Sequence, residues 1–413
     1  MANLSAARIV DALADAAERW RDADFPARVR ATHAVMQRTG YTEPVVDFAL
    51  DALFDDLTRA TLRATIAGEL GALEALDGFV ARAGRPAVHY RGVDVATIVS
   101  SDTTIGVAIP ALAFALCAKV GTLVVKDRSD GLVSAFVETI AEERPELGAC
   151  VRVERWEGYS APEALAALTE SDVVVAFGGD AALAAIRARL RPDARFVPYG
   201  HRTSVAYVAR ETLADTAVAR AAAAGIARDA LLYDGAGCLS LHAVFVERGG
   251  ALEPAAFGAL LAEALDAAAV EFPSGADEPA NSTAIYASTA RFRATQGASA
   301  VRGGVTAAHV LVIDAAADEA PPLLPRALAT HAIDGPDEAA AYLRRHAVPL
   351  EGFALDTATG DARPDVLALA VASGASRVAP FGALQTPSIA GEHGGTPRIL
   401  SFVRAIAREG SHR

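Results

Sequence analysis

The spacing of hydrophobic and polar positions changes along this chain of 413 residues. Up to about residue 85, apolar residues recur every three to four positions, which is the period of helices that bury one face. The stretches with this pattern are 6–21, 25–39, 44–57 and 62–83. Turn residues interrupt it at Gly40 to Pro44 and again at Gly84 to Pro86. The pattern predicts a helical N-terminal region over residues 1–90.

From about residue 92, short runs rich in Val, Ile and Leu alternate with longer stretches of helical period. The predicted strands are 93–99, 122–126, 150–154, 173–176 and 195–198. The predicted helices are 105–120, 132–143, 161–168 and 181–190. Strands that alternate with helices of this length predict parallel βαβ units in a doubly wound sheet. Such a sheet binds ligands beyond the carboxyl ends of its strands.

The second half of the chain continues the alternation less regularly. Here the predicted strands are 205–208, 243–247, 309–313 and 353–355, and the predicted helices are 212–224, 254–270, 336–346 and 364–372. Residues 271–304 are rich in Pro, Ser, Gly and Thr, which predicts a long loop. The tail from Pro380 to Gly395 is expected to be coil, followed by a helix over 397–407.

Composition and charge limit the class of protein. Hydrophobic residues make up 52% of the chain and charged residues 22%, which indicates a globular protein. A net charge of −13 argues against nucleic acid as a partner. We find neither an apolar run of membrane-spanning length nor a signal peptide. Three unevenly spaced cysteines provide no disulfide framework and fit a reducing cytoplasm, and we expect no metal site.

One cysteine stands out by its position. Cys238 lies where a turn containing Gly235 and Gly237 meets the apolar strand 243–247. A thiol on such a corner can face a cleft, which suits a covalent catalyst. The alternative is a packed thiol, because free cysteine is among the most buried residue types. Cys117 and Cys150 are interpreted as packed thiols of that kind.

Two strand ends carry residues suited to a nucleotide. Lys126, Arg128 and Ser129 come directly after an apolar strand, and Gly178 and Gly179 open a helix after the next-but-one strand. Glycines at a helix start admit a pyrophosphate to the helix N-terminus, although the same pair also fits a plain tight turn. The dinucleotide fingerprint Gly-x-Gly-x-x-Gly is absent after the first strand.

Four short segments, in this order along the chain, resemble segments of a known family. They are a strand ending in Lys126, the turn Phe177-Gly178-Gly179, the segment Tyr199-Gly-His-Arg-Thr-Ser204, and the segment Gly237-Cys-Leu-Ser-Leu-His242 followed by Val244-Phe-Val-Glu247. Together they resemble the acyl-CoA reductases of the LuxC type, a divergent branch of the aldehyde dehydrogenase superfamily. The tail with Gly382 and Glu392-His-Gly-Gly395 is similar to the C-terminal segment of that superfamily.

The resemblance implies a fold and a reaction. The expected fold is an α/β aldehyde dehydrogenase-like fold of two doubly wound, Rossmann-like domains with a helical N-terminal region. The expected domains are 1–90 (helical region), 91–235 (cofactor binding), 236–375 (catalytic) and 376–413 (a C-terminal segment packed on the core). Cys238 would attack a fatty acyl thioester, and the acyl-enzyme would be reduced to an aldehyde by NADPH. The implied substrate is acyl-CoA or an acyl-protein thioester, the implied partner is an acyl-transferase or acyl-protein ligase, and we expect a cytoplasmic homo-oligomer.

The sequence departs from the superfamily at two catalytic positions. Pro198 stands where aldehyde dehydrogenases carry a glutamate base, and Asp102, followed by Thr103 and Thr104, stands where they carry an asparagine that binds the oxyanion. Two alternatives therefore stay open: an aldehyde dehydrogenase that oxidises an aldehyde to an acid or to acyl-CoA, and a non-catalytic relative that serves as a partner subunit. His201 and His242 are candidate proton carriers, and each fits a structural histidine equally well.

The cofactor preference rests on the residues after the strand-end lysine. NAD-selective aldehyde dehydrogenases hold the ribose hydroxyl with an acidic residue three positions after that lysine. Here the position is Ser129, with Arg128 beside it. A small hydroxyl leaves room for a 2′-phosphate, and an arginine can pair with it bidentately. The resemblance therefore predicts NADPH, held by Lys126, Arg128, Ser129, Gly178 and Gly179.

Overall fold

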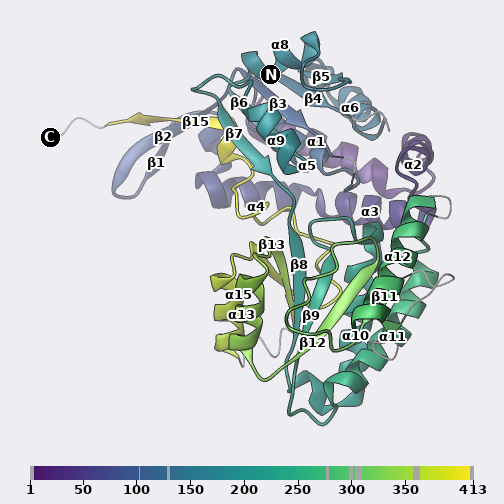
Figure 1. Cartoon of the computed structure of the whole chain (residues 1–413). Helices are drawn as coiled ribbons and strands as arrows, with labels where there is room; N and C mark the ends of the chain where they lie inside the picture. The colour runs from purple at the N-terminus through teal and green to yellow at the C-terminus, as the bar shows by residue number, and fades with distance from the viewer. Residues whose placement is uncertain are drawn as a thin grey trace. The chain divides into compact units, whose positions relative to one another are not determined.

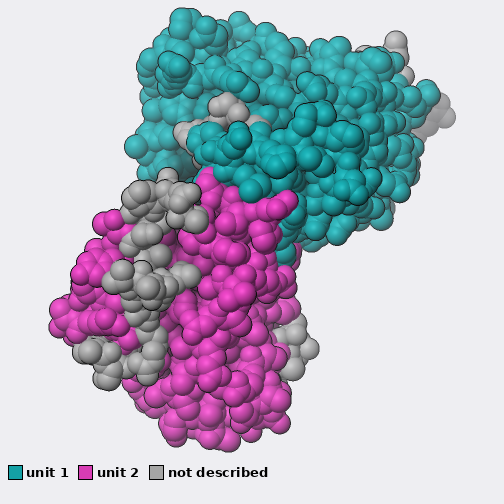
Figure 2. Space-filling model, turned by 90° about the vertical axis from the view of Figure 1, so that its right-hand side faces the viewer, with its two compact units in different colours: residues 1–39, 46–200, 388–413 teal, residues 40–45, 201–387 magenta. Residues whose placement is uncertain are grey.

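The computed structural model describes residues 4–101, 103–127, 131–275, 279–296, 301–302, 309–356 and 363–409. Within it the chain forms two compact units (Figures 1 and 2). Unit 1 comprises residues 1–39, 46–200 and 388–413, and unit 2 comprises residues 40–45 and 201–387. Each unit is built on its own parallel sheet, as the alternation of strands and helices predicts.

Unit 1 contains a five-stranded parallel sheet in the order β5-β4-β3-β6-β7. Its strands are β3 (Val95–Val99), β4 (Thr122–Lys126), β5 (Val151–Glu154), β6 (Val173–Phe177) and β7 (Arg195–Tyr199). All five residues of β6 are buried, because a parallel sheet is covered by helices on both faces. The strand order reverses between β3 and β6, which is the switch point where doubly wound sheets bind ligands.

Helices cover this sheet and extend the unit. The crossover helices are α5 (Ala108–Cys117), α6 (Leu132–Glu143), α7 (Pro145–Gly148), α8 (Pro162–Glu170) and α9 (Asp180–Arg187). The N-terminal helices are α1 (Ala6–Arg21), α2 (Pro26–Thr39), α3 (Glu43–Asp56) and α4 (Arg59–Leu70), followed by the 3-10 turn η1 (Leu73–Leu76). Trp20 joins them to the sheet layer, because its ring lies 5.0 Å from Phe54 and 5.9 Å from Phe136.

An antiparallel ribbon of unit 1 corrects two predictions. Strands β1 (Val80–Arg82), β2 (Arg85–Gly92) and β15 (Val403–Arg408) form a three-stranded sheet, where we predicted helix up to residue 83 and over 397–407. β15 pairs with β2 from Val403 opposite Gly92 to Arg408 opposite Ala87. Only Val403 of β15 is buried, so the strand lacks the apolar alternation that identifies strands in a sequence.

Unit 2 contains a seven-stranded sheet in the order β10-β11-β12-β9-β8-β13-β14, in which β10 alone is antiparallel to its neighbour. The strands are β8 (Thr203–Val208), β9 (Leu241–Glu247), β10 (Val301–Arg302), β11 (Val310–Val312), β12 (Ala327–Ile333), β13 (Leu350–Leu355) and β14 (Arg377–Ala379). We did not predict β12, because its sequence Ala-Leu-Ala-Thr-His-Ala-Ile shows neither alternation nor a run of β-branched residues.

Helices of unit 2 cover both faces of its sheet (Figure 1). Ala206, Val208 and Val244 pack in one core with helices α10 (Thr216–Leu231) and α11 (Pro254–Glu271). Val205 and Phe245 point the other way, into a core with α13 (Pro336–Arg345) and α15 (Pro364–Ala372). The 3-10 turns η2 (Thr212–Ala214) and η3 (Leu232–Gly235) flank α10. Residues 279–296 form helix α12 (Pro279–Gln296), which corrects the long loop predicted over 271–304.

The units divide the chain differently from the predicted domains. The N-terminal helices share unit 1 with the first sheet, apart from residues 40–45, and the main segment of unit 2 begins at residue 201 rather than 236. The difference has a physical cause: β8 and α10, predicted as part of the cofactor domain, pair and pack with β9 and α11. No helix in the described ranges is long and apolar enough to cross a membrane.

Candidate active site

The backbone before Cys238 adopts an uncommon conformation. Three consecutive residues at the end of η3 have positive φ: Tyr233 (55°), Asp234 (52°) and Gly235 (71°). Positive φ is rare for residues other than glycine, and residues held there cluster at functional sites. The chain thereby leaves α10, turns sharply and enters β9 with Cys238 at the amino edge of the sheet.

A buried ion pair holds this turn. Arg326, just before β12, has a fully buried side chain whose Nε donates to Asp234 Oδ1 over 2.6 Å. Its Nη2 donates to the carbonyl of Phe272 over 2.5 Å, and its backbone N–H donates to the Asp234 carbonyl over 3.0 Å. A β-carbon on Gly235 would approach the Arg326 nitrogen to 3.1 Å, so the glycine allows this close approach.

Ser204 fixes the carbonyl of Cys238. The buried Ser204 Oγ, on β8, donates to the Cys238 carbonyl over 3.1 Å and accepts from the Gly352 N–H over 2.9 Å. On the other side of the cysteine, Ser240 N–H donates to the Gly237 carbonyl over 3.0 Å. Gln385 Nε2 reaches Ser240 Oγ over 3.2 Å. The half-buried thiol is thus carried on a loop whose backbone is bonded on both sides.

The surroundings keep Cys238 in the thiol form. Burial, and next the charge of Glu351, raise the pKa of Cys238 to about 12. The N–H groups of Cys238 and Leu239 and the charge of Arg202 act in the opposite direction. At a pKa of about 12, only about one molecule in 10⁵ carries a thiolate at pH 7. Because the thiolate is the nucleophile, a reaction at this residue needs a proton acceptor.

The other two cysteines belong to unit 1. Cys117 is fully buried in α5, and burial alone raises the pKa of its thiol to about 12. Cys150 is half-buried at the start of β5, where its Sγ donates to the Glu146 carbonyl over 3.2 Å. These placements agree with the interpretation of both as packed thiols.

Two β-bulges flank Ser204. On one side, Thr203 and Ser204 of β8 oppose Leu350 and Gly352 of β13, so that Glu351 is an extra residue. On the other side, Ser204 and Val205 oppose Leu241 and Ala243 of β9, so that His242 is an extra residue. Bulges are common next to active sites, where they re-aim a side chain. Both extra residues are ionisable, and both lie at the sheet edge that carries Cys238.

The two candidate histidines lie in contrasting environments. His242 is 6% exposed, and its Nδ1 lies 3.0 Å from the Pro322 carbonyl and 3.2 Å from the Ala327 carbonyl. Burial lowers the pKa of His242, against the effect of these carbonyls, and a charge on nearby His201 lowers it further. His201 itself is exposed. The contacts of His242 favour a positioning role, and proton transfer by either histidine stays a prediction.

Unit 1 carries the predicted cofactor residues that the structure describes. Lys126 ends β4 and is 6% exposed, and burial lowers the pKa of its ammonium group. Gly178 and Gly179 follow β6 at the switch point and lead into α9, whose N-cap is Gly179. A β-carbon on Gly179 would meet nothing within 4 Å, so the space above this helix start is open. These residues fit a nucleotide pyrophosphate; Arg128, Ser129 and Asp102 lie outside the described residues.

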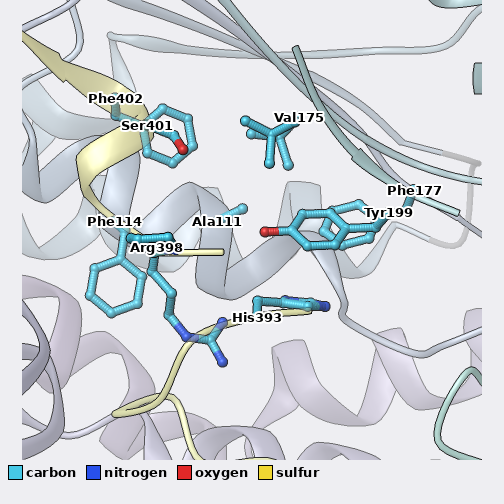
Figure 3. Close-up of a pocket in the computed structure, with 11 residues that line it drawn as sticks. Ala111, Phe114, Val175, Phe177, Tyr199, His393, Arg398, Ser401 and Phe402 are labelled. Carbon is cyan, nitrogen blue, oxygen red and sulfur yellow. The ribbon is translucent and has the colours of Figure 1, made fainter. Parts of the chain in front are cut away.

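An aromatic pocket is lined by residues of β6 and β7 (Figure 3). The rings of Phe177 and Tyr199 stack at 4.8 Å, and His393 lies 4.3 Å from Tyr199. Arg398 and Ser401 complete the polar lining of this pocket. Burial, and next the charge of Arg398, lower the pKa of His393 to about 3, so the ring is neutral at pH 7. The stack supports the strand end from which Gly178 and Gly179 extend.

The C-terminal segment is held on this pocket by helix carboxylates. Glu69 of α4 accepts from the N–H groups of Arg398, Ile399 and Leu400 over 2.6, 2.9 and 3.0 Å. We did not predict that Tyr199 and His393 lie together, although both stand within the quoted motifs. Nor did we single out Glu351, a charged residue among the apolar residues of β13. In the part of the chain that the structure describes, no group of His, Cys, Asp and Glu side chains could hold a metal ion.

Comparisons with solved structures identify the fold. A NAD-dependent benzaldehyde dehydrogenase from Corynebacterium glutamicum is 15% identical, with a TM-score of 0.68 over 98% of this chain and 87% of the other. A putative aldehyde dehydrogenase from Burkholderia cenocepacia is 17% identical, with a TM-score of 0.71 over 98% and 88%. A mutant of aldehyde dehydrogenase C from Pseudomonas syringae, complexed with NAD+ and octanal, is 16% identical, with a TM-score of 0.68 over 98% and 85%.

These neighbours confirm the predicted aldehyde dehydrogenase-like α/β fold. A search of the curated proteins gave no match. The family model described as acyl-CoA reductase (LuxC) matches residues 1–405, nearly the whole chain, which confirms the resemblance drawn from the four motif pieces. The chain therefore belongs to the acyl-CoA reductase (LuxC) family of oxidoreductases, within the aldehyde dehydrogenase fold.

Proposed function

We propose that the protein reduces an acyl thioester, such as acyl-CoA, to an aldehyde with NADPH through a thioester on Cys238. The observation that carries the proposal is the position of this thiol. It is half-buried at a sheet edge, on a loop anchored through Ser204 and Ser240. Family membership supplies the substrate class.

The proposed reaction divides into two transfers. Cys238 Sγ attacks the acyl carbonyl, the bond from that carbon to the coenzyme A sulfur breaks, and coenzyme A leaves as a thiol. NADPH, when bound, supplies the hydride that reduces the acyl carbon. The carbon–Sγ bond then breaks with its electron pair on Sγ, which releases the aldehyde, and a proton from solvent restores the thiol. The Cys238 N–H is our candidate donor to the carbonyl oxygen during the attack.

One feature favours reduction over acid formation. Pro198, on β7, has no side-chain proton acceptor at the position where aldehyde dehydrogenases activate water. The alternatives, an acid-forming dehydrogenase or a non-catalytic subunit, both predict no aldehyde from acyl-CoA.

The direct test is a product assay with acyl-CoA and NADPH. We expect loss of NADPH absorbance, release of free coenzyme A and formation of aldehyde in equal amounts. Formation of acid from an aldehyde and NADP⁺, with no reduction of acyl-CoA over a range of chain lengths, would contradict the proposal. The same assay with acyl-protein thioesters tests the proposed partner, an acyl-transferase or acyl-protein ligase, and the mass of the assembly in solution tests the proposed homo-oligomer.

We predict that NADPH is preferred over NADH. Lys126 ends the strand beside the switch point, and Ser129 replaces the acidic residue that would repel a 2′-phosphate. Replacing Ser129 with glutamate should lower kcat/KM for NADPH by about 10-fold or more, because it adds a like charge beside the phosphate. The comparison of kcat/KM for both cofactors, in the wild type and in Ser129→Glu, measures this. An equal or higher value for NADH in the wild type would refute the preference.

A further inference from the structure

An irregularity in the sheet brings the backbone of Glu351 close to the segment that carries Cys238. It is the extra residue of the bulge in β13, next to Gly352, whose N–H donates to Ser204 Oγ over 2.9 Å. The same oxygen donates to the Cys238 carbonyl over 3.1 Å. One hydroxyl therefore joins the backbone beside Glu351 to the backbone of the nucleophile. A β-carbon on Gly352 would lie 3.3 Å from a methyl group of Leu239, which shows how closely the two segments pack.

The carboxylate is buried and oriented. Glu351 is 7% exposed, and its Oε1 accepts from Ser376 Oγ over 2.5 Å. Its Oε2 lies 3.5 Å from Arg202 Nε, and Arg202 Nη1 donates to the Leu350 carbonyl over 3.0 Å. A buried carboxylate costs free energy unless it is paired and hydrogen-bonded, and here both conditions are met. Arg202 and Glu351 are the charged groups that act on the Cys238 thiol, and the phenol of Tyr233 also faces it.

The charge at this position acts against a resting thiolate. Glu351 is the second-largest cause, after burial, of the raised pKa of Cys238. A site that only needed a thiolate would carry a cation here instead, because a nearby positive charge lowers the pKa of a thiol. A carboxylate whose charge acts on a nearby protonated thiol can serve as its general base, and such pairs often tighten when the substrate binds. Among the nearby groups, His242 is engaged by backbone carbonyls and His201 is exposed.

We infer that Glu351 is the proton acceptor for Cys238, a role that rests on the function proposed above. As Sγ bonds to the acyl carbon, the S–H bond breaks and its proton passes to the Glu351 carboxylate. As the bond from that carbon to the coenzyme A sulfur breaks, the departing thiolate takes the proton and leaves as coenzyme A thiol. Glu351 thus returns to its starting form with the acyl-enzyme. In this role Glu351, on β13 in unit 2, accepts the proton of the Cys238 thiol. Pro198, which stands at the water-activating position of aldehyde dehydrogenases, lies on β7 in unit 1.

Two measurements on Glu351→Gln test this inference, because they are expected to change in opposite directions. The first is the pKa of the Cys238 thiol, from the pH dependence of iodoacetamide alkylation followed by peptide mass; loss of the negative charge should lower it. The second is the rate at which Cys238 is acylated by acyl-CoA without NADPH, followed by intact mass after rapid quenching. Loss of the base should slow this step by about 10²-fold or more.

Control variants distinguish loss of the proton acceptor from a general disturbance of the fold. Glu319→Gln removes a partly buried carboxylate of unit 2, whose side chain is 16% exposed against 9% for Glu351, and which also pairs with an arginine, Arg291. It should leave both measurements unchanged. Glu351→Asp keeps the carboxylate and should retain more acylation than Glu351→Gln. An unchanged circular dichroism spectrum and an unchanged melting temperature in each variant show that the fold is intact.

Some results would overturn only the role of Glu351, and another would overturn the proposed function as well. A Glu351→Gln variant acylated as fast as the wild type, or faster in step with its lower thiol pKa, shows that Glu351 only suppresses the thiolate and is not the base. Acylation lost equally in Glu351→Asp and Glu319→Gln would also overturn it, because any disturbance of unit 2 would then have the same effect. A wild-type protein that acyl-CoA leaves unlabelled would overturn the proposed function, and this inference with it.

Discussion

Replacing Cys238 with alanine is expected to lower thioester reduction by on the order of 10⁴-fold or more, because removal of a covalent nucleophile leaves only binding and orientation to act. The fold should persist, since the half-buried side chain contributes little to the core clusters of unit 2. NADPH binding should persist as well, because the predicted cofactor residues belong to unit 1. Activity is measured by NADPH absorbance with acyl-CoA, and binding by quenching of NADPH fluorescence.

Cys150→Ala is the matched control for this prediction. Cys150 is the other half-buried thiol, and it lies at the start of β5 in unit 1. Its removal should leave the reduction rate unchanged. An active Cys238→Ala variant, or a loss of activity in Cys150→Ala of the same size, would show that Cys238 is not the nucleophile.

Arg326→Met should destabilise unit 2 by about 3–5 kcal/mol, because it leaves the Asp234 carboxylate buried without its partner. The side chain of Arg326 is fully buried and that of Asp234 is 11% exposed, so solvent cannot replace the lost contact. The turn before Cys238 should loosen at the same time, since Asp234 is held at positive φ by this pair. Guanidinium denaturation, followed by a probe of unit 2, measures the change in the free energy of unfolding.

Two further variants test whether the unpaired Asp234 carboxylate causes the loss of stability. The double variant Asp234→Asn with Arg326→Met removes both charges and should recover part of the loss. Arg220→Met breaks the exposed pair with Glu263, whose side chains are 59% and 66% exposed, and should cost about 1 kcal/mol or less. If the double variant is as unstable as Arg326→Met, the unpaired charge is not the cause of the instability.

The parts of the fold that the sequence predicted are those with regular apolar spacing. Helix α6 begins at Leu132 and ends at Glu143, as predicted, because its apolar positions follow one face. Strands such as β6 are recognisable as runs of valine bounded by polar turns. The alanine-rich strands β12 and β15 were missed, because alanine favours helices and neither strand shows alternation.

The residues of the candidate site also differ in whether the sequence alone predicts them. Cys238, Gly178 and Gly179 are local features, since each stands at a turn next to an apolar strand and is visible in the sequence. The charge of Glu351 acts on Cys238, and Arg326 pairs with Asp234, so both interactions join segments about a hundred residues apart. Their roles depend on strand order and on bulges, which a single sequence does not encode in any local pattern.

Whether Cys238 carries the acyl group is measured most directly by the mass of the protein incubated with acyl-CoA in the absence of NADPH. We expect a gain of one acyl group, located on the peptide that contains Cys238, and its loss with release of aldehyde when NADPH is added. A label on the peptide of Cys117 or Cys150, or aldehyde formed with no labelled protein at any time, would contradict it.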